Sequence, residues 1–188
     1  MTDQLPPPVC WLHPDVESRV SGVAGVGLFA RVGLPVGTVV SRLGGKLVAW
    51  SELQELFAAA AGLPEGVRRY VDTVAISRTR HLVLPPGSTN GFGNHSCDPN
   101  LWWTDPYSLT VRRDVAAGAE LTFDYATCTG DEAYRLDCEC RSPLCRGAVT
   151  GADWRLPELR ARYGEHWVPV LRERWWAGGI NGVNGPEC

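Results

Sequence analysis

Hydrophobic residues before residue 150 come in short runs that alternate with polar residues, and glycine, proline and polar clusters separate one run from the next. Short alternating segments bounded by turn residues are typical of β-strands. We therefore expect a mainly β chain with short helices. The expected strands cover residues 9–12, 20–30 (as a pair), 37–41, 70–76, 81–84, 101–103, 108–113 and 120–125.

The clearest helical pattern covers residues 51–62. Ser51 is the expected N-cap, Gln54 occupies the capping-box position, and Gly62 can end the helix. Residues 65–70 are expected to add one further turn.

The last forty residues differ from the rest of the chain, because their aromatic residues recur with helical spacing. One helix is expected to run from the region of residues 153–157 to Tyr163. A second is expected from residue 165 to 176, where Pro169 would interrupt it. Residues 178–188 show no periodicity and predict a loose tail.

Composition limits the possible classes of protein. A chain of 188 residues with 44% hydrophobic residues can bury one core, so we expect one domain with a small appendage. A net charge of −3 lacks the excess of basic residues typical of nucleic-acid-binding proteins, so we expect no direct nucleic-acid binding. No apolar run is long enough to span a membrane, and residues 1–8 lack the features of a secretory signal. The expected location is therefore the cytoplasm.

Cysteine usage points to a metal site. Three of the seven cysteines, Cys138, Cys140 and Cys145, lie close together. In a chain with no export signal such clustering favours zinc, which thiolates bind tetrahedrally, and the alternatives are free thiols or a disulfide. A closed zinc site needs a fourth ligand. The candidates for it are Cys97, Cys128 and His95.

Two other stretches have unusual compositions. Residues 94–100 read NHSCDPN, so side chains of fixed hydrogen-bonding geometry fill most positions. Gly25 and Gly27 flank a single residue in the expected strand pair. Such pairs usually form turns or bulges, and the alternative is that the missing side chains let the backbone approach a ligand. We expect residues 94–100, residues 120–125 and the clustered cysteines to meet in space.

Four motifs, taken together and in their order along the chain, indicate a protein family. They are GVGLFA at 25–30, NHSCDPN at 94–100, VRRDVAAGAELTFDY at 111–125 and CECRSPLCRG at 138–147. With these motifs the chain resembles the SET-domain protein-lysine methyltransferases that carry a post-SET zinc segment. The resemblance covers roughly residues 17–149, and the two central motifs together give it most of its specificity.

The resemblance implies a SET-domain β-fold of small sheets, in which the segments around His95 and Tyr125 form a pseudoknot. A zinc-binding post-SET segment and a helical tail would follow. The implied divisions are an N-terminal extension at 1–16, the SET domain at 17–127, the post-SET segment at 128–150 and the tail at 151–188.

The resemblance also implies an activity, namely transfer of a methyl group from S-adenosylmethionine to a protein lysine, with S-adenosylhomocysteine as product. It implies that Tyr125 is the catalytic tyrosine and that Phe123 tunes the number of methyl groups added. The implied cofactor-binding residues are Gly25, Val26, Gly27, Leu28, Asn94, His95 and Tyr125. The implied zinc ligands are Cys97, Cys138, Cys140 and Cys145. The expected partner is a protein or peptide with an exposed lysine, such as a histone or a basic nucleoid-type protein.

The chain departs from the family pattern on the substrate side. Residues 40–45 lack the tyrosine and the Gly-Glu pair usual after the first strands, and residues 91–93 read GFG where R-F-I is common. One alternative is therefore a SET-fold binding module that has lost catalysis. Another, from a different class, is a zinc-ribbon scaffold. Phe123 lacks a hydroxyl that could hold a water in the lysine channel, which suggests methylation beyond the monomethyl product.

Overall fold

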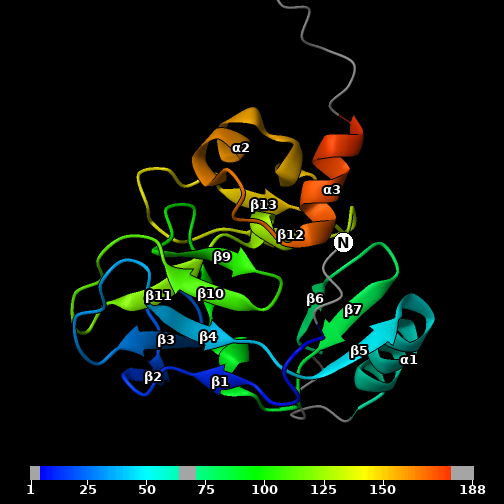
Figure 1. Ribbon diagram of the computed structural model, residues 1–188, viewed down its shortest axis with the longest axis horizontal. Coiled ribbons are helices and arrows are strands. Elements are labelled where there is room, and N and C mark those ends of the chain that lie inside the picture. Colours follow the sequence, from blue (N-terminus) through cyan, green and yellow to red (C-terminus); the bar gives the residue numbers. More distant parts are fainter. Residues whose placement is uncertain (1–4, 64–70, 179–188) are drawn as a thin grey trace, which may run out of the picture.

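The computed structural model describes residues 5–63 and 71–178, and these ranges form four small β-sheets with three α-helices (Figure 1). The expectation of a mainly β chain with short helices is confirmed. The turn expected at 65–70 and the tail beyond residue 178 lie outside the described residues. Every helix in the described ranges is too short or too polar to cross a bilayer.

The first sheet is antiparallel and forms part of the core. Its strands, in spatial order, are β1 (Trp11–Leu12), β4 (Val39–Arg42), β10 (Ser108–Val111) and β9 (Leu101–Asp105). All four residues of β10 are buried. Because neighbouring side chains of a strand point to opposite faces, both faces of β10 must be covered by other parts of the chain.

The second sheet carries the NHSC and FDY motifs. Its strands, in spatial order, are β2 (Val16–Val20), β3 (Val26–Ala30), β11 (Glu120–Phe123) and β8 (Asn94–His95). β11 and β8 are parallel, with Thr122 opposite Asn94 and Phe123 opposite His95. This pairing places the two motifs side by side, as expected, although they lie far apart in the sequence.

A third sheet lies beside the first two and packs on a helix (Figure 1). Its strands, in spatial order, are β5 (Lys46–Ala49), β7 (Arg80–Val83) and β6 (Thr73–Ala75), and the helix is α1 (Trp50–Ala61). The expectation that Ser51 caps this helix is wrong: Ala49 is the N-cap, and no side chain accepts a hydrogen bond there. β5 runs directly into the helix, so Ser51 falls inside its first turn.

The remaining elements gather at the opposite end of the molecule (Figure 1). They are the hairpin β12 (Arg135–Asp137) and β13 (Ala148–Thr150), α2 (Pro157–Tyr163) and α3 (Pro169–Gly178). The sequence analysis expected Pro169 to interrupt a helix over residues 165–176, and this expectation is wrong, because Pro169 begins α3. A proline suits the first position of a helix because its missing N–H needs no partner there.

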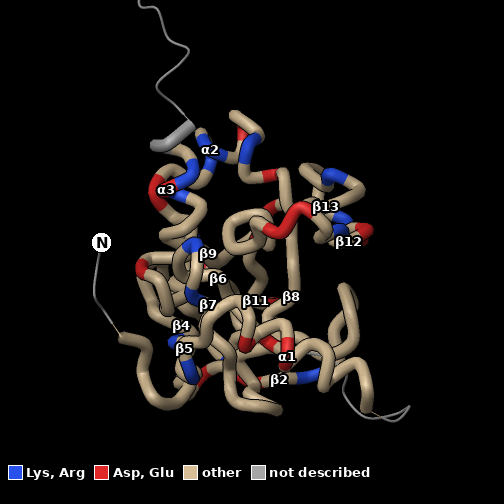
Figure 2. Tube along the Cα trace, turned by 90° about the vertical axis from the view of Figure 1, so that its right-hand side faces the viewer, with Lys and Arg blue, Asp and Glu red and all other residues tan. Residues whose placement is uncertain are grey.

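Charges are mixed along the chain. In the view of Figure 2, basic and acidic residues are interspersed over most elements. This distribution agrees with the small net charge of −3.

Candidate active site and metal centre

Tyr125 lies two residues beyond the end of β11, at the start of a short 3-10 turn, Tyr125–Thr127. Its hydroxyl donates a hydrogen bond to the carbonyl of Gly93 over 2.9 Å. The ring of Phe123 lies 5.0 Å from that of Tyr125, centroid to centroid, and its edge meets Trp103 at 5.9 Å. The ring of Tyr125 therefore lies in an aromatic environment, and its hydroxyl proton is directed to a backbone carbonyl.

His95 joins Tyr125 to the cysteine cluster. Its Nδ1 accepts a hydrogen bond from the backbone N–H of Tyr125 over 3.1 Å, and its Nε2 lies 3.3 Å from Sγ of Cys97. Because Nδ1 is an acceptor, the ring proton is on Nε2 and points at the sulfur. Burial lowers the pKa of His95 to about 4, which keeps the ring neutral. Both ring nitrogens are thus engaged within the protein.

Asn94 is held by its amide nitrogen alone. Nδ2 donates to Oε1 of Glu120 over 2.8 Å and to the carbonyls of Ala24 and Val26 over 3.0 and 3.3 Å. Among the described residues no donor reaches Oδ1 of Asn94. Since β8 is also the edge strand of its sheet, an amide oxygen and an open strand edge lie next to each other.

The two glycines of the first motif have different reasons to be glycine. A Cβ at Gly27 would lie 2.2 Å from Oε1 of Glu120, so the missing side chain makes room for Glu120. Gly25 has a φ of +47°, and nothing lies within 4 Å of a Cβ built there. Gly25 therefore offers the open surface that a ligand needs. Leu28, in contrast, is 1% exposed and belongs to the core, so its side chain presents no surface to a ligand.

Four cysteine sulfurs gather on the Nε2 side of His95. They belong to Cys97, Cys138, Cys140 and Cys145, and all lie within 4.8 Å of one another. The Sγ of Cys138 is 3.8 Å from that of Cys97 and 3.7 Å from that of Cys145. Tetrahedral zinc with Zn–S bonds of about 2.3 Å separates its sulfurs by about 3.8 Å. The cluster therefore has the spacing of a closed zinc site.

The other two candidates for a fourth ligand lie outside this cluster. Cys128 directs its sulfur to the carbonyl of Tyr125 at 3.5 Å, and His95 contacts a cysteine of the cluster without joining it. Backbone amides support the cluster itself: the N–H of Arg146 donates to Sγ of Cys97, and the N–H of Cys97 donates to Sγ of Cys140, each over 3.4 Å. Such N–H···S contacts favour thiolates, the form that binds metal.

A buried charge network, which the sequence analysis missed, lies beside the cluster. Asp124 accepts hydrogen bonds from both terminal guanidinium nitrogens of Arg146, at 2.7 and 2.8 Å, and from the hydroxyl of Tyr163 at 2.9 Å. Nε of Arg146 also donates to Asp153 over 3.1 Å. The network ties the turn that carries Tyr125 to the cysteine segment and to α2. No local sequence signal marks it, since its members lie in four separate segments.

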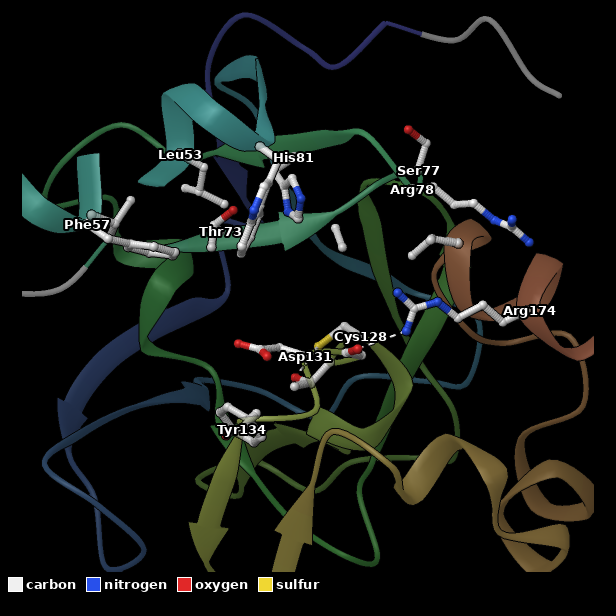
Figure 3. A pocket seen from close by; sticks show the side chains of 16 residues that line it. Leu53, Phe57, Thr73, Ser77, Arg78, His81, Cys128, Asp131, Tyr134 and Arg174 are labelled. Atoms are coloured by element: carbon white, nitrogen blue, oxygen red, sulfur yellow. Dashed lines mark hydrogen bonds between the residues drawn. The ribbon is translucent and has the colours of Figure 1, made fainter. Parts of the chain in front are cut away.

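A cleft of about 490 Å³ has two sides (Figure 3). α1 and the third sheet form one side, and the segment that follows Tyr125 forms the other. Every second residue from Val71 to Ser77 lines one wall of the cleft, and this stretch includes edge strand β6. The other wall is formed by residues 128–131 and Tyr134, with Val170 and Arg174 of α3 at one end. The cleft floor at Cys128 is in contact with the carbonyl of Tyr125, so the cleft and the aromatic site are neighbours.

Comparisons with known proteins converge on one family. The profile of the SET domain matches residues 25–126. The chain is 32% identical to the histone-lysine N-methyltransferase ATX2 of Arabidopsis thaliana over 75% of this chain and 14% of that protein. It is 25% identical to the histone-lysine N-methyltransferase ash1 of Drosophila melanogaster over 93% of this chain and 8% of that protein. The chain thus spans only a small part of the relatives it matches.

A solved structure supports the fold. The structure of the methyltransferase domain of human histone-lysine N-methyltransferase SETMAR superposes on this chain. The match covers 73% of this chain and 57% of the SETMAR chain. The TM-score is 0.54 at 20% sequence identity. At this identity the likeness bears on the fold alone.

Proposed function

The chain belongs to the SET-domain family, and on this premise we propose that it is an S-adenosylmethionine-dependent protein-lysine N-methyltransferase. The observation that carries the proposal is the arrangement around Tyr125. Its hydroxyl is oriented by a backbone carbonyl, and its amide is fixed by a neutral histidine. The amide oxygen of Asn94, which no donor of the described residues reaches, belongs to the strand that pairs with the strand leading to Tyr125.

The cofactor would be held on the open side of β8. Bound S-adenosylmethionine supplies a methyl group on a cationic sulfur. Oδ1 of Asn94 is suited to accept from its ammonium group, and the exposed surface at Gly25 leaves space beside it. His95 would contribute its backbone, because both of its ring nitrogens are engaged within the protein.

The substrate amine has to lose a proton before it can react. An unperturbed lysine has a pKa of about 10.4, so neutralising it at pH 7 costs roughly 4–5 kcal/mol. The rings of Phe123, Tyr125 and Trp103 form an apolar surrounding that disfavours the ammonium. The hydroxyl of Tyr125, whose proton is directed to Gly93, can accept an N–H bond from the amine and orient its lone pair. Its role is thus positioning rather than proton removal.

The four cysteines would hold a structural zinc ion. Residues 138–147 contain few apolar side chains, so the segment needs a metal to order it. The same segment supplies Arg146 to Asp124, next to Tyr125. A bound zinc ion would therefore fix the position of the catalytic turn as well as its own loop.

The cleft would receive the polypeptide that carries the target lysine. β6 is an edge strand, and an extended peptide can add to such an edge by main-chain hydrogen bonds. The relatives named above are histone-lysine N-methyltransferases. For this chain we propose the broader class of a protein lysine in an extended segment.

The proposal is tested by transfer of labelled methyl groups to proteins of a host extract, with the products located by tandem mass spectrometry. Lys46 is the single lysine of the chain, so Lys46→Arg removes self-methylation without changing the charge. Tyr125→Phe is expected to lower kcat by about 100-fold while cofactor binding persists. Cofactor binding without transfer would instead indicate a binding module, and absence of cofactor binding would indicate a zinc scaffold.

A further inference from the structure

The two ends of the cleft have different chemistry (Figure 3). At one end lie Leu53 and Phe57 of α1, with Trp50 packed on His81 at a centroid distance of 5.3 Å. Burial lowers the pKa of His81, so its ring adds no positive charge there at neutral pH. Phe57 is 40% exposed and Trp50 46% exposed, which makes this end an accessible apolar surface.

The other end is basic. Arg78, from the turn between β6 and β7, and Arg174 of α3 both line the cleft there (Figure 3). Within the described ranges neither guanidinium has a carboxylate partner. These two arginines therefore bring positive charge to one end of the cleft, and neither forms an ion pair with a carboxylate of the described residues.

The backbone of Gly130 fixes the side chain of Arg174 at this end of the cleft. One guanidinium nitrogen donates to the carbonyl of Gly130 over 2.8 Å. A Cβ at Gly130 would lie 2.6 Å from the same nitrogen, so the glycine makes room for the arginine. A fixed guanidinium loses less conformational freedom when it binds a carboxylate than a free one does.

Among the described residues that line the cleft, Asp131 is the only acidic one. Its Oδ1 accepts a hydrogen bond from the backbone N–H of Ala133 over 3.0 Å, which holds the side chain in its own turn. Within the described lining, two arginines against one locally engaged aspartate give a net positive charge.

We propose that this cleft selects protein segments in which an aspartate or glutamate lies on the side of the target lysine facing Arg78 and Arg174, and an apolar residue lies on the other side. The inference rests on the proposed function, since it assigns the cleft to the substrate. Planar guanidinium groups recognise carboxylates through paired hydrogen bonds, and the Trp50 and Phe57 end matches an apolar side chain. Uniformly basic segments, such as a lysine-rich tail, are disfavoured by the same charges.

The test uses the full chain with the Lys46→Arg background and a set of synthetic 15-residue peptides with one central lysine. Each peptide carries Glu, Gln or Arg at a single flanking position, and all flanking positions are scanned. Methyl transfer gives kcat and KM, and the anisotropy of fluorescein-labelled peptides gives binding independently of catalysis. The variants are Arg78→Gln and Arg174→Gln, with Arg174→Lys to restore the charge. The matched control is Arg80→Gln, an exposed arginine near the same turn that does not line the cleft.

We expect Glu at positions on one side of the lysine to lower both the peptide Kd and KM about five- to tenfold relative to Gln, and Arg there to raise them. Arg78→Gln and Arg174→Gln should each reduce the preference about threefold, Arg174→Lys should restore most of it, and Arg80→Gln should leave it unchanged. Equal binding of the Glu, Gln and Arg peptides, or a preference that survives both variants, would overturn the inference. Charge-selective binding without methyl transfer would support the inference and count against the proposed enzyme activity instead.

Discussion

Arg146, the residue after the last clustered cysteine, forms a two-point ion pair with Asp124, the residue before Tyr125, at 2.7 and 2.8 Å. The carboxylate side chain is fully buried, and the guanidinium side chain is 15% exposed. Because Asp124 is also the cap of the turn that begins with Tyr125, the pair connects the cysteine segment to the proposed catalytic residue. The order of the cysteine cluster and that of the turn carrying Tyr125 are therefore physically linked.

Loss of this ion pair should be costly. Arg146→Ala leaves Asp124 buried without its cation and is expected to lower the free energy of unfolding by about 3–5 kcal/mol. Arg146→Lys keeps the charge and should cost less. Urea unfolding followed by circular dichroism measures the difference. The control is Arg135→Ala, which removes an exposed pair with Asp137 and should cost less than about 1 kcal/mol. Equal effects of Arg146→Ala and Arg135→Ala would contradict the assigned role of the network.

Metal removal should destabilise the protein and weaken cofactor binding together. Burial raises the pKa of the Cys97 thiol to about 11, so this sulfur needs a nearby cation to be a thiolate at neutral pH. Elemental analysis should find one zinc per chain. Cys140→Ser is expected to remove it, to lower Tm by about 10 °C and to weaken S-adenosylmethionine binding in calorimetry.

Cys10→Ser is the matched control for metal loss. Cys10 lies outside the cluster and exchanges hydrogen bonds with the backbone of Gly44, which a serine can also make. Its zinc content and Tm should stay near those of the unchanged chain. A zinc-free protein that binds the cofactor normally would refute the link between the two sites.

Phe123 should set the number of methyl groups added. Its ring borders that of Tyr125, and it has no hydroxyl to hold a water beside the amine. Phe123→Tyr is therefore expected to shift the product toward monomethyl-lysine, with little loss of the first transfer. Mass spectrometry of a time course shows the distribution. If the unchanged chain stops at the monomethyl product after long incubation, this role of Phe123 is wrong.

Below neutral pH, protonation of His81 should contribute to a loss of the free energy of unfolding. Burial lowers the pKa of His81 in the folded chain below the ordinary value of about 6.5. Above pH 6.5 the ring is neutral in both the folded and the unfolded state. As the pH falls below that value, the unfolded chain takes up the proton first, and the folded state loses stability.

The measurement is urea unfolding at pH 7 and pH 5 for the unchanged chain and for His81→Gln. The unchanged chain should lose more stability between the two pH values, because glutamine does not titrate. Parallel pH dependences of the two proteins would show that His81 does not contribute.

Much of the fold could be predicted because its signals are local. Alternation of apolar and polar residues identified the strand over 108–113, observed as Ser108–Val111, and the pattern over 51–62 identified a helix, observed as Trp50–Ala61. The errors concerned ends of elements. Ser51 is not the cap of α1, and Pro169 begins α3, because neighbouring structure decides where an element starts.

The site was predicted unevenly. Cysteine spacing indicated a metal but left Cys97, Cys128 and His95 open as fourth ligand, and only the resemblance selected Cys97. The convergence of the four sulfurs agrees with that selection. The roles of Asn94, Phe123 and Tyr125 stay predictions, for which the cofactor and peptide experiments above provide tests.

By itself the sequence determined which segments carry chemistry, since motif composition and short-range periodicity are properties of neighbouring residues. The meeting of the segments that form β8 and β11 was expected before the structure, and their parallel pairing agrees with it. Only the tertiary structure decided the contact of Arg146 with Asp124 and the placement of two arginines at one end of the cleft. These contacts join residues many positions apart, and they form only when burial of the shared core outweighs the entropy of closing the chain between them. No pattern within one segment can report that balance.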